Sequence, residues 1–272
     1  MRQKWLPKVP FEIMLDIFIS PCPNDTFMFH SLCKGIRKIS VPLSFHYLDI
    51  AELNQKVLSG EPGAFKLSFA TLFRVEDQYQ MLNSGAALGY GCGPLLLRRP
   101  GLSDPGPDSL VAIPGSSTTA FALLKTYYPF IRKTICLRFD EIPKQMVEGK
   151  IDYGLVIHET RFVYNDLGLE LFCDLGELFE NDTKAPIPLG VIAVHKSLAE
   201  LAVELEQAIR SSINDSKRDF PVEFCQEFAQ EMDPEVLRNH VKTYVNEFSL
   251  DLGERGLVGV NRLREYCRLA DS

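Results

Sequence analysis

The sequence lacks paired cysteines at metal-binding or redox spacing. Its seven cysteines are odd in number and widely separated: Cys22, Cys33, Cys92, Cys136, Cys173, Cys225 and Cys267. The absence of a C-x-x-C pair argues against a zinc site and against a thioredoxin-like motif. Scattered thiols are typical of the reducing cytoplasm, where cysteine behaves as a small hydrophobic residue. We therefore predict a cytoplasmic protein without a metal ion.

Long apolar runs are also missing. No stretch approaches the roughly 18 uncharged apolar residues that span a bilayer, so we expect no membrane segment. Basic residues precede apolar ones at the N-terminus, as in a signal peptide, but Glu12 and Asp16 interrupt the apolar run. No small-residue cleavage site follows. We expect no signal peptide and interpret 12–20 as a buried first strand.

An excess of positive charge is absent too. Lys and Arg total 29 against 36 Asp and Glu, giving a net charge of −7. A general nucleic-acid-binding protein needs a basic surface, so this class is excluded. With 46% hydrophobic and 24% charged residues, the chain of 272 residues can bury a core. Its length predicts one large or two smaller α/β domains.

Strand-like and helix-like patterns alternate in two sets, one before Leu97 and one between Ser109 and Leu175. The remainder after Leu198 is mostly amphipathic helix. Alternation of this kind is typical of parallel α/β sheets. We predict two α/β lobes that face each other across a cleft, with ligands at the carboxyl ends of strands. The expected strands cover 12–20, 41–48, 64–70, 95–97, 109–113, 135–139, 153–157, 171–175 and 189–195, and expected helices cover 27–33, 50–59, 119–127 and 144–148.

The first strand-end motif runs from Ser20 to Phe27 and opens a helix, with Asn24 or Asp25 as the expected N-cap. Free N–H groups at such a turn suit an anion. The alternative, which the local pattern favours, is an ordinary cap between two turn prolines. Cys22 at a helix N-terminus could be a nucleophile. No local signature supports that role, and we do not predict it.

A second motif, Lys66-Leu67-Ser68, ends an apolar strand. A lysine in such a run is costly to bury unless it has an anionic partner or reaches water. Lys66 could therefore bind a substrate carboxylate, with Ser68 adding a hydroxyl, or it could extend to the surface. The pattern leaves both open.

The third motif places Gly115 and four hydroxyl residues, 116–119, at a helix start. Neither a Walker A loop nor a Gly-x-Gly-x-x-Gly fingerprint is present. The cluster of hydroxyl and N–H groups favours binding of a small acid or a hydroxyl group over helix capping alone.

The fourth motif is His158-Glu159-Thr160-Arg161-Phe162, directly after an apolar strand. A histidine at a strand end can project into a cleft, where its pKa suits a general base. Glu159 and Arg161 could orient it or hold an anion; the alternative is a capping or core histidine. The other histidines lie within or beside expected helices and strands: His30, His46, His195 and His240. We predict His158 as the general base.

Taken in order, these motifs resemble the 1,4-dihydroxy-6-naphthoate synthase family of menaquinone biosynthesis by the futalosine route. The resemblance covers about 15–255. It rests on the segments 20–27, 66–68, 84–94, 114–119, 158–162, 188–190 and 244–251. Any one motif is weak, but the ordered set is specific.

The resemblance implies a two-lobed fold like that of type II periplasmic binding proteins. We expect lobe 1 to comprise 1–97 and 196–272, and lobe 2 to comprise 98–195. It implies cleavage of cyclic dehypoxanthinyl futalosine to 1,4-dihydroxy-6-naphthoate and dihydroxyacetone, without a metal or nucleotide cofactor. His158 would be the proton acceptor, and the substrate-binding positions would be Lys66, Leu67, Ser68, Thr118 and Thr119, with Asn24 as a weaker candidate.

Two alternatives stay open. A related enzyme of the same fold dehydrates chorismate, although the segments 158–162 and 244–251 favour the naphthoate synthase. A solute-binding protein is the second alternative, and it would bind a small acid without turnover. The sequence leaves a homo-oligomer open and assigns no role to Trp5.

Overall fold

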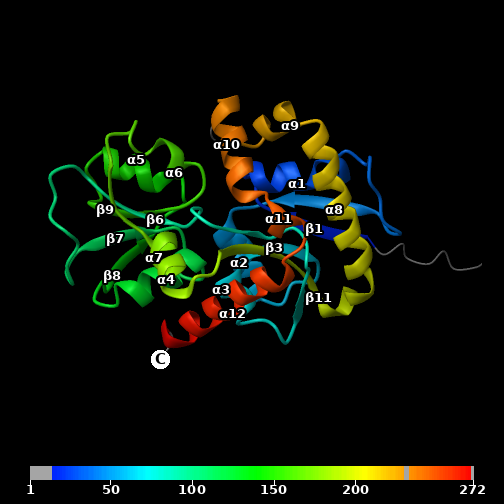
Figure 1. Ribbon diagram of the computed structural model, residues 1–272, viewed down its shortest axis with the longest axis horizontal. Helices are drawn as coiled ribbons and strands as arrows, with labels where there is room; N and C mark the ends of the chain where they lie inside the picture. Colours follow the sequence, from blue (N-terminus) through cyan, green and yellow to red (C-terminus); the bar gives the residue numbers. More distant parts are fainter. Residues whose placement is uncertain (1–13, 230–232, 271–272) are drawn as a thin grey trace, which may run out of the picture.

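Two β-sheets form the centres of two lobes (Figure 1). The computed structural model describes residues 14–229 and 233–270. The first sheet has the order β2-β1-β3-β11-β4, and β5 pairs with β11. Its strands are β1 (Leu15–Ile19), β2 (Leu43–Tyr47), β3 (Ala64–Ser68), β4 (Tyr79–Met81), β5 (Ala87–Gly89) and β11 (Ile187–His195). The expected first strand is thus confirmed over Leu15–Ile19, while Trp5 and Glu12 lie outside the described residues.

The second sheet has the order β10-β6-β9-β7-β8. Its strands are β6 (Leu95–Arg98), β7 (Leu110–Ile113), β8 (Lys133–Cys136), β9 (Tyr153–Val156) and β10 (Glu170–Asp174). Both sheets are mixed rather than purely parallel. β1 pairs in parallel with β2 and β3, and β7 with β8 and β9, but β6, β10 and β11 run antiparallel to their neighbours.

The sheets correct the expected lobe boundaries. β11, expected in lobe 2, pairs with β3 in the first sheet, and β6, expected mostly in lobe 1, pairs with β9 in the second. These are the strands that follow the two passages of the chain between sheets. β6 runs antiparallel to β9, and β11 runs antiparallel to β3. The chain therefore passes to the other lobe before each of these two strands, and not after it.

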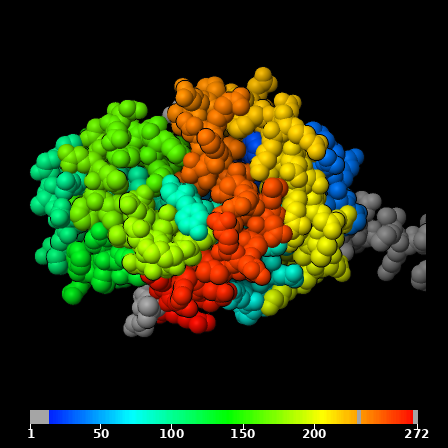
Figure 2. Space-filling view, viewed as in Figure 1, coloured from blue at the N-terminus to red at the C-terminus, as the bar shows by residue number. Residues whose placement is uncertain are grey.

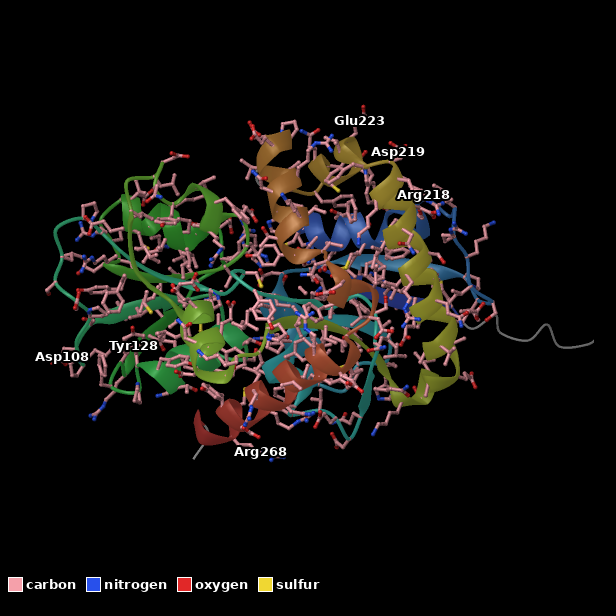
Figure 3. All side chains as sticks on the ribbon, in the orientation of Figure 1. Asp108, Tyr128, Arg218, Asp219, Glu223 and Arg268 are labelled. Atoms are coloured by element: carbon pink, nitrogen blue, oxygen red, sulfur yellow. The ribbon has the colours of Figure 1, made fainter. Side chains whose placement is uncertain are left out.

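Helices cover the two sheets (Figure 1). Figure 3 shows the labelled residues Asp108, Arg218 and Glu223 at the outer edges of the molecule. The helices are α1 (Pro23–Cys33), α2 (Ile50–Leu58), α3 (Phe69–Leu72), α4 (Thr119–Tyr127), α5 (Glu141–Val147), α6 (Thr160–Val163), α7 (Leu175–Thr183), the 3-10 helix η1 (Lys196–Leu201), α8 (Ala202–Arg218), α9 (Val222–Gln226), α10 (Pro234–Tyr244), α11 (Glu247–Leu250) and α12 (Gly253–Ala270). No helix in the described part of the chain is long and apolar enough to cross a membrane.

Local signals explain where α2 begins and ends. Asp49 and Glu52 form a reciprocal capping box at its start. Gly60, just beyond its end, has a φ of +76°, which favours glycine. The start of α1 differs from the prediction. Its N-cap is Cys22, which makes no side-chain cap bond, while Asn24 and Asp25 lie inside the first turn and the Asp25 carboxylate accepts from Ser20.

One hydrophobic cluster runs through both lobes. It joins Phe65 and Val191 of the first sheet to Leu96 and Val111 of the second. The last helix, α12, packs against both sides: its Tyr266 ring lies 5.9 Å from Tyr127 on α4, and its other contacts include α3 and β11. Figure 2 shows α12, in red, against the green second lobe. The lobes are therefore packed together as well as connected by chain.

Candidate active site

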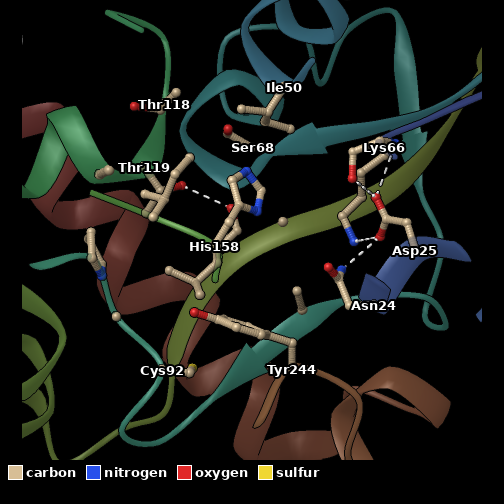
Figure 4. Close-up of a pocket in the computed structure, with 18 of the residues that line it drawn as sticks. Asn24, Asp25, Ile50, Lys66, Ser68, Cys92, Thr118, Thr119, His158 and Tyr244 are labelled. Atoms are coloured by element: carbon tan, nitrogen blue, oxygen red, sulfur yellow. Dashed lines mark hydrogen bonds and ion pairs between the residues drawn. The ribbon is translucent and has the colours of Figure 1, made fainter. Parts of the chain in front are cut away.

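A cavity lies between the lobes, where the strands of both sheets end (Figure 4). It holds about 670 Å³ of empty space, a volume that includes the solvent at its opening. Residues after β1, β3, β7 and β9 line it, as expected for α/β sheets. They include Ser20, Asn24, Asp25, Lys66, Ser68, Thr118, Thr119, Ile157 and His158, joined by Cys92, Gly190, His240 and Tyr244.

Lys66 has an anionic partner. Its Nζ lies 2.7 Å from Oδ1 of Asp25; Lys66 is 4% exposed and Asp25 is fully buried. The other Asp25 oxygen accepts from the Ser20 hydroxyl at 2.6 Å and from the Ser20 amide. Since a buried charge needs such a partner, the pair explains how a lysine ends an apolar strand. Lys66 does not extend to the surface.

Close approach of β11 keeps Lys66 in place. A Cβ atom added at Gly190 would lie 2.8 Å from Cε of Lys66. Any larger residue there would collide with the lysine stem, so the glycine provides the space that the ion pair occupies. Leu67, predicted as a binding residue, has its side chain in the hydrophobic core instead. The alternation of side chains along β3 sends Lys66 and Ser68 to the cavity and Leu67 to the opposite face.

Asn24 links the ion pair to a helix of the C-terminal region. Its Nδ2 donates to Asp25 Oδ1 at 2.9 Å, and its Oδ1 lies 3.1 Å from Nε2 of His240 on α10. His240 is 1% exposed, and burial lowers its pKa well below the ordinary value, so the ring is neutral. The sequence offered only a histidine within a helix at this position.

The hydroxyl groups of the second and third motifs meet at one end of the cavity. Ser68 Oγ accepts from the Asn54 side chain at 3.0 Å. Thr118 caps α4 by accepting from the Phe121 amide, and Thr119 Oγ1 donates to the Leu189 carbonyl at 3.2 Å. Thr118 and Thr119 line the cavity. Ser116 and Ser117 instead line a neighbouring hollow.

His158 follows β9 in an uncommon backbone conformation. Its φ is +59°, in the left-handed region that non-glycine residues rarely adopt. Its Nδ1 lies 3.1 Å from Sγ of Cys22, and the Phe139 ring packs against it at 4.6 Å. Desolvation by the surrounding protein lowers its pKa to about 4, opposed in part by the negative charge of Asp25. At neutral pH the ring is therefore neutral, and one of its two nitrogens carries a lone pair.

The residues that flank His158 do not orient it as expected. Arg161 donates to the Gly93 carbonyl at 2.6 Å and to Asp174 at 2.7 Å. It thereby ties α6 to the chain segment that enters the second lobe. Glu159 is buried beside a separate hollow rather than at the cavity. Neither charge lines the cavity where His158 lies.

The side chain of Cys22 is a protonated thiol and not the thiolate that a nucleophile requires. Burial, and next the negative charge of Glu159, raise the pKa of Cys22 well above its ordinary value. The helix N-terminus does not overcome this desolvation. Cys22 is instead the hydrogen-bonding neighbour of His158.

Sequence reasoning did not single out Asp25 as a charge partner, nor His240, Tyr244 and Cys92 as cavity residues. Figure 4 shows Tyr244 and Cys92 on the wall opposite Thr118 and Ser68. Burial raises the pKa of Tyr244, so its hydroxyl stays protonated. Two signals were available. A lysine in an apolar strand calls for a carboxylate, and His240 and Tyr244 are four residues apart on one helix face.

Two α/β lobes around a cavity at their strand ends define the class of fold found in periplasmic binding proteins. A ligand-binding component of an ABC-type import system from Staphylococcus aureus has a TM-score of 0.67 at 15% identity, covering 94% of this chain and 92% of that one. This likeness concerns the fold alone. A crystal structure of a protein from Archaeoglobus fulgidus is more similar, with a TM-score of 0.88 and 27% identity over 95% of this chain and 98% of that one.

The family follows from sequence comparison. A family model described as menaquinone biosynthesis matches residues 15–269. A 1,4-dihydroxy-6-naphthoate synthase of Thermus thermophilus is 41% identical, covering 92% of both chains. One from Streptomyces coelicolor is 39% identical, covering 92% of this chain and 91% of the relative. The chain belongs to the menaquinone biosynthesis family, which confirms the predicted resemblance.

Proposed function

We propose that this protein is a 1,4-dihydroxy-6-naphthoate synthase that splits cyclic dehypoxanthinyl futalosine to the naphthoate and dihydroxyacetone. The observation that carries the proposal is a neutral imidazole, that of His158, held at a strand end beside a buried polar network. The two similar relatives both have this activity in their names, which favours it over chorismate dehydration. The resemblance to transport proteins concerns only the fold, so it does not favour a binding protein over an enzyme.

The chemistry assigned to the cavity is a carbon–carbon cleavage that ends in an aromatic ring. Such a step requires a proton to leave carbon, and aromatisation supplies driving force. His158 has the lone pair that takes the proton, and a positioned base contributes about 10²–10⁴-fold to the rate. If Nε2 is the accepting nitrogen, Nδ1 carries hydrogen and Cys22 Sγ, 3.1 Å away, accepts it. Cys22 would then fix the tautomer.

Substrate binding divides between the two ends of the cavity. The N-terminus of α4, with Thr118, Thr119 and the nearby Ser68, suits the substrate carboxylate because free N–H groups and a helix dipole favour negative charge. Lys66 is already matched by Asp25, so this pair adds no net charge. The end of the cavity formed by this pair and Asn24 suits neutral hydroxyl groups of the substrate.

The proposal includes a cofactor-free reaction in the cytoplasm. The buried thiols Cys22, Cys92 and Cys225 suit a reducing compartment. Turnover without metal or nucleotide stays a prediction, tested by dialysis against a chelator with no nucleotide added. Retained turnover would support it, and loss that is restored by one divalent cation would contradict it.

The first experiment incubates the purified protein with cyclic dehypoxanthinyl futalosine and separates the products by chromatography. We expect naphthoate and dihydroxyacetone in equal amounts, and at least about 10²-fold slower formation of both by His158→Asn. Chorismate is assayed in parallel. Product from chorismate alone would overturn the proposal in favour of the dehydratase, and binding of either compound without turnover would indicate a binding protein.

A further inference from the structure

His240 lines the cavity. It lies on α10, four residues before Tyr244, and it is almost completely buried. The rings of Tyr244 and Phe162 flank the imidazole, with centroids 4.6 and 6.1 Å away. The function assigned to His158 does not use this second histidine.

The contacts of Asn24 determine which nitrogen of His240 carries the proton. The Asp25 carboxylate is held by Lys66 and accepts, so the Asn24 atom facing it is the donating amide nitrogen. The other Asn24 atom, Oδ1, can then only accept, and it lies 3.1 Å from His240 Nε2. Nε2 therefore carries the hydrogen.

Nδ1 of His240 consequently has the lone pair. It is buried and has no hydrogen-bond partner among the residues that the structure describes. Burial keeps the ring neutral, so protonation does not relieve this. A buried acceptor without a donor costs free energy. Because His240 lines the cavity, the contents of the cavity are the available source of a donor.

We propose that His240 Nδ1 accepts a hydrogen bond from a hydroxyl group of the bound substrate. This rests on the proposed function and adds a residue to it. The neutral imidazole and the neutralised Asp25–Lys66 pair together form a wall that binds a polyhydroxylated portion, while the α4 end receives the carboxylate. His240 is thus a substrate-binding residue whose neutral ring accepts a hydrogen bond from a hydroxyl group and offers no donor to an anion.

Two substitutions separate the nitrogens. His240→Gln places its amide near Nε2, so it keeps the bond to Asn24 and loses the acceptor at Nδ1. His240→Asn places its amide near Nδ1 and loses the bond to Asn24. His195→Gln is the matched control, since His195 bonds to Ser197 at the end of β11.

The measurement is the dissociation constant for cyclic dehypoxanthinyl futalosine, obtained by calorimetry in a His158→Asn background that blocks turnover. We expect His240→Gln to weaken binding by about 10- to 100-fold at unchanged melting temperature. The effect of His240→Asn should be smaller on binding and larger on melting temperature. His195→Gln should change neither.

Equal affinities of the parent and His240→Gln would overturn the proposal. Should His240→Gln fail to fold, ¹⁵N NMR of histidine-labelled His158→Asn protein decides. The Nδ1 resonance of His240 should move towards the hydrogen-bonded range when substrate saturates the protein, and no movement would refute the assignment. Wild-type protein that neither binds nor converts the substrate would instead overturn the proposed function itself.

Discussion

The two sides of the cavity differ in how completely their polar groups are bonded. On the side of the first sheet, Asp25, Lys66, Ser20 and Asn24 satisfy one another in a buried network. On the side of the second sheet, His158 has a left-handed backbone and a single thiol neighbour, Cys22. A network whose charged groups are paired suits recognition because it has little reason to rearrange. A loosely bonded base suits chemistry because its protonation must change.

Replacing the base should produce the largest effect on activity. We expect His158→Asn to lower kcat by about 10²–10⁴-fold with little change in KM. Asparagine tolerates a φ of +59°, so the fold should survive. Steady-state kinetics give kcat and KM of His158→Asn, with Asp108→Asn, a substitution at the outer edge of the molecule, as the control. A rise in KM at constant kcat would place His158 in the binding wall.

Breaking the ion pair should have the largest effect on stability. Lys66→Met leaves the Asp25 carboxylate buried without a cationic partner, and we expect the free energy of unfolding to fall by about 3–5 kcal/mol. The double variant Asp25→Asn/Lys66→Met leaves no charge and should regain part of this loss. Urea unfolding measures both. A double variant that is less stable than Lys66→Met would contradict the account.

Lowering the pH should destabilise the fold through protonation of His158. Its pKa is lowered from 6.5 to about 4 on folding, so its contribution to stability is complete above pH 6.5 and is lost as the pH falls to about 4. That contribution is at most about 3 kcal/mol.

The check compares urea unfolding of wild-type protein and His158→Asn at pH 7 and pH 5. The wild type should lose more stability between these values, because the variant lacks this group. Equal losses would mean that His158 titrates alike in the folded and unfolded chains. The kcat of wild-type protein should likewise decline only as the pH approaches 4.

Removal of the thiol neighbour should have the smallest effect. Cys22→Ala deletes one weak hydrogen bond, and we expect kcat to fall about 2- to 10-fold. Cys225→Ala, another buried cysteine, is the matched control and lies outside the cavity. A loss as large as that of His158→Asn would make Cys22 a participant in the chemistry.

Sequence reasoning located the strand ends but not their pairing. Periodicity predicted β3 and β9 because apolar runs and turn residues are local signals, and His158 and Ser68 follow directly from them. The partner of Lys66 lies 41 positions away, in the first turn of α1, which comes close to Lys66 only because β1, the strand before it, pairs with β3. Contacts of this range leave no local pattern.

The same reason explains two corrections. The lobe to which β6 and β11 belong depends on where the chain passes from one lobe to the other. No short stretch of sequence shows this position. His240 presents an ordinary helix pattern, because its cavity face is also the apolar face of an amphipathic helix. Leu67 was included by resemblance to a motif, while alternation along β3 would have placed its side chain in the core.

The last helix, α12, has a consequence for how ligand binding is coupled to the arrangement of the two lobes. α12 contacts both lobes. Tyr266 contacts Tyr127 and Phe179 on one half, and Arg264 lies over Phe73 on the other. Because these contacts hold the two lobes together in the absence of a ligand, less of a ligand's binding energy is needed to order them.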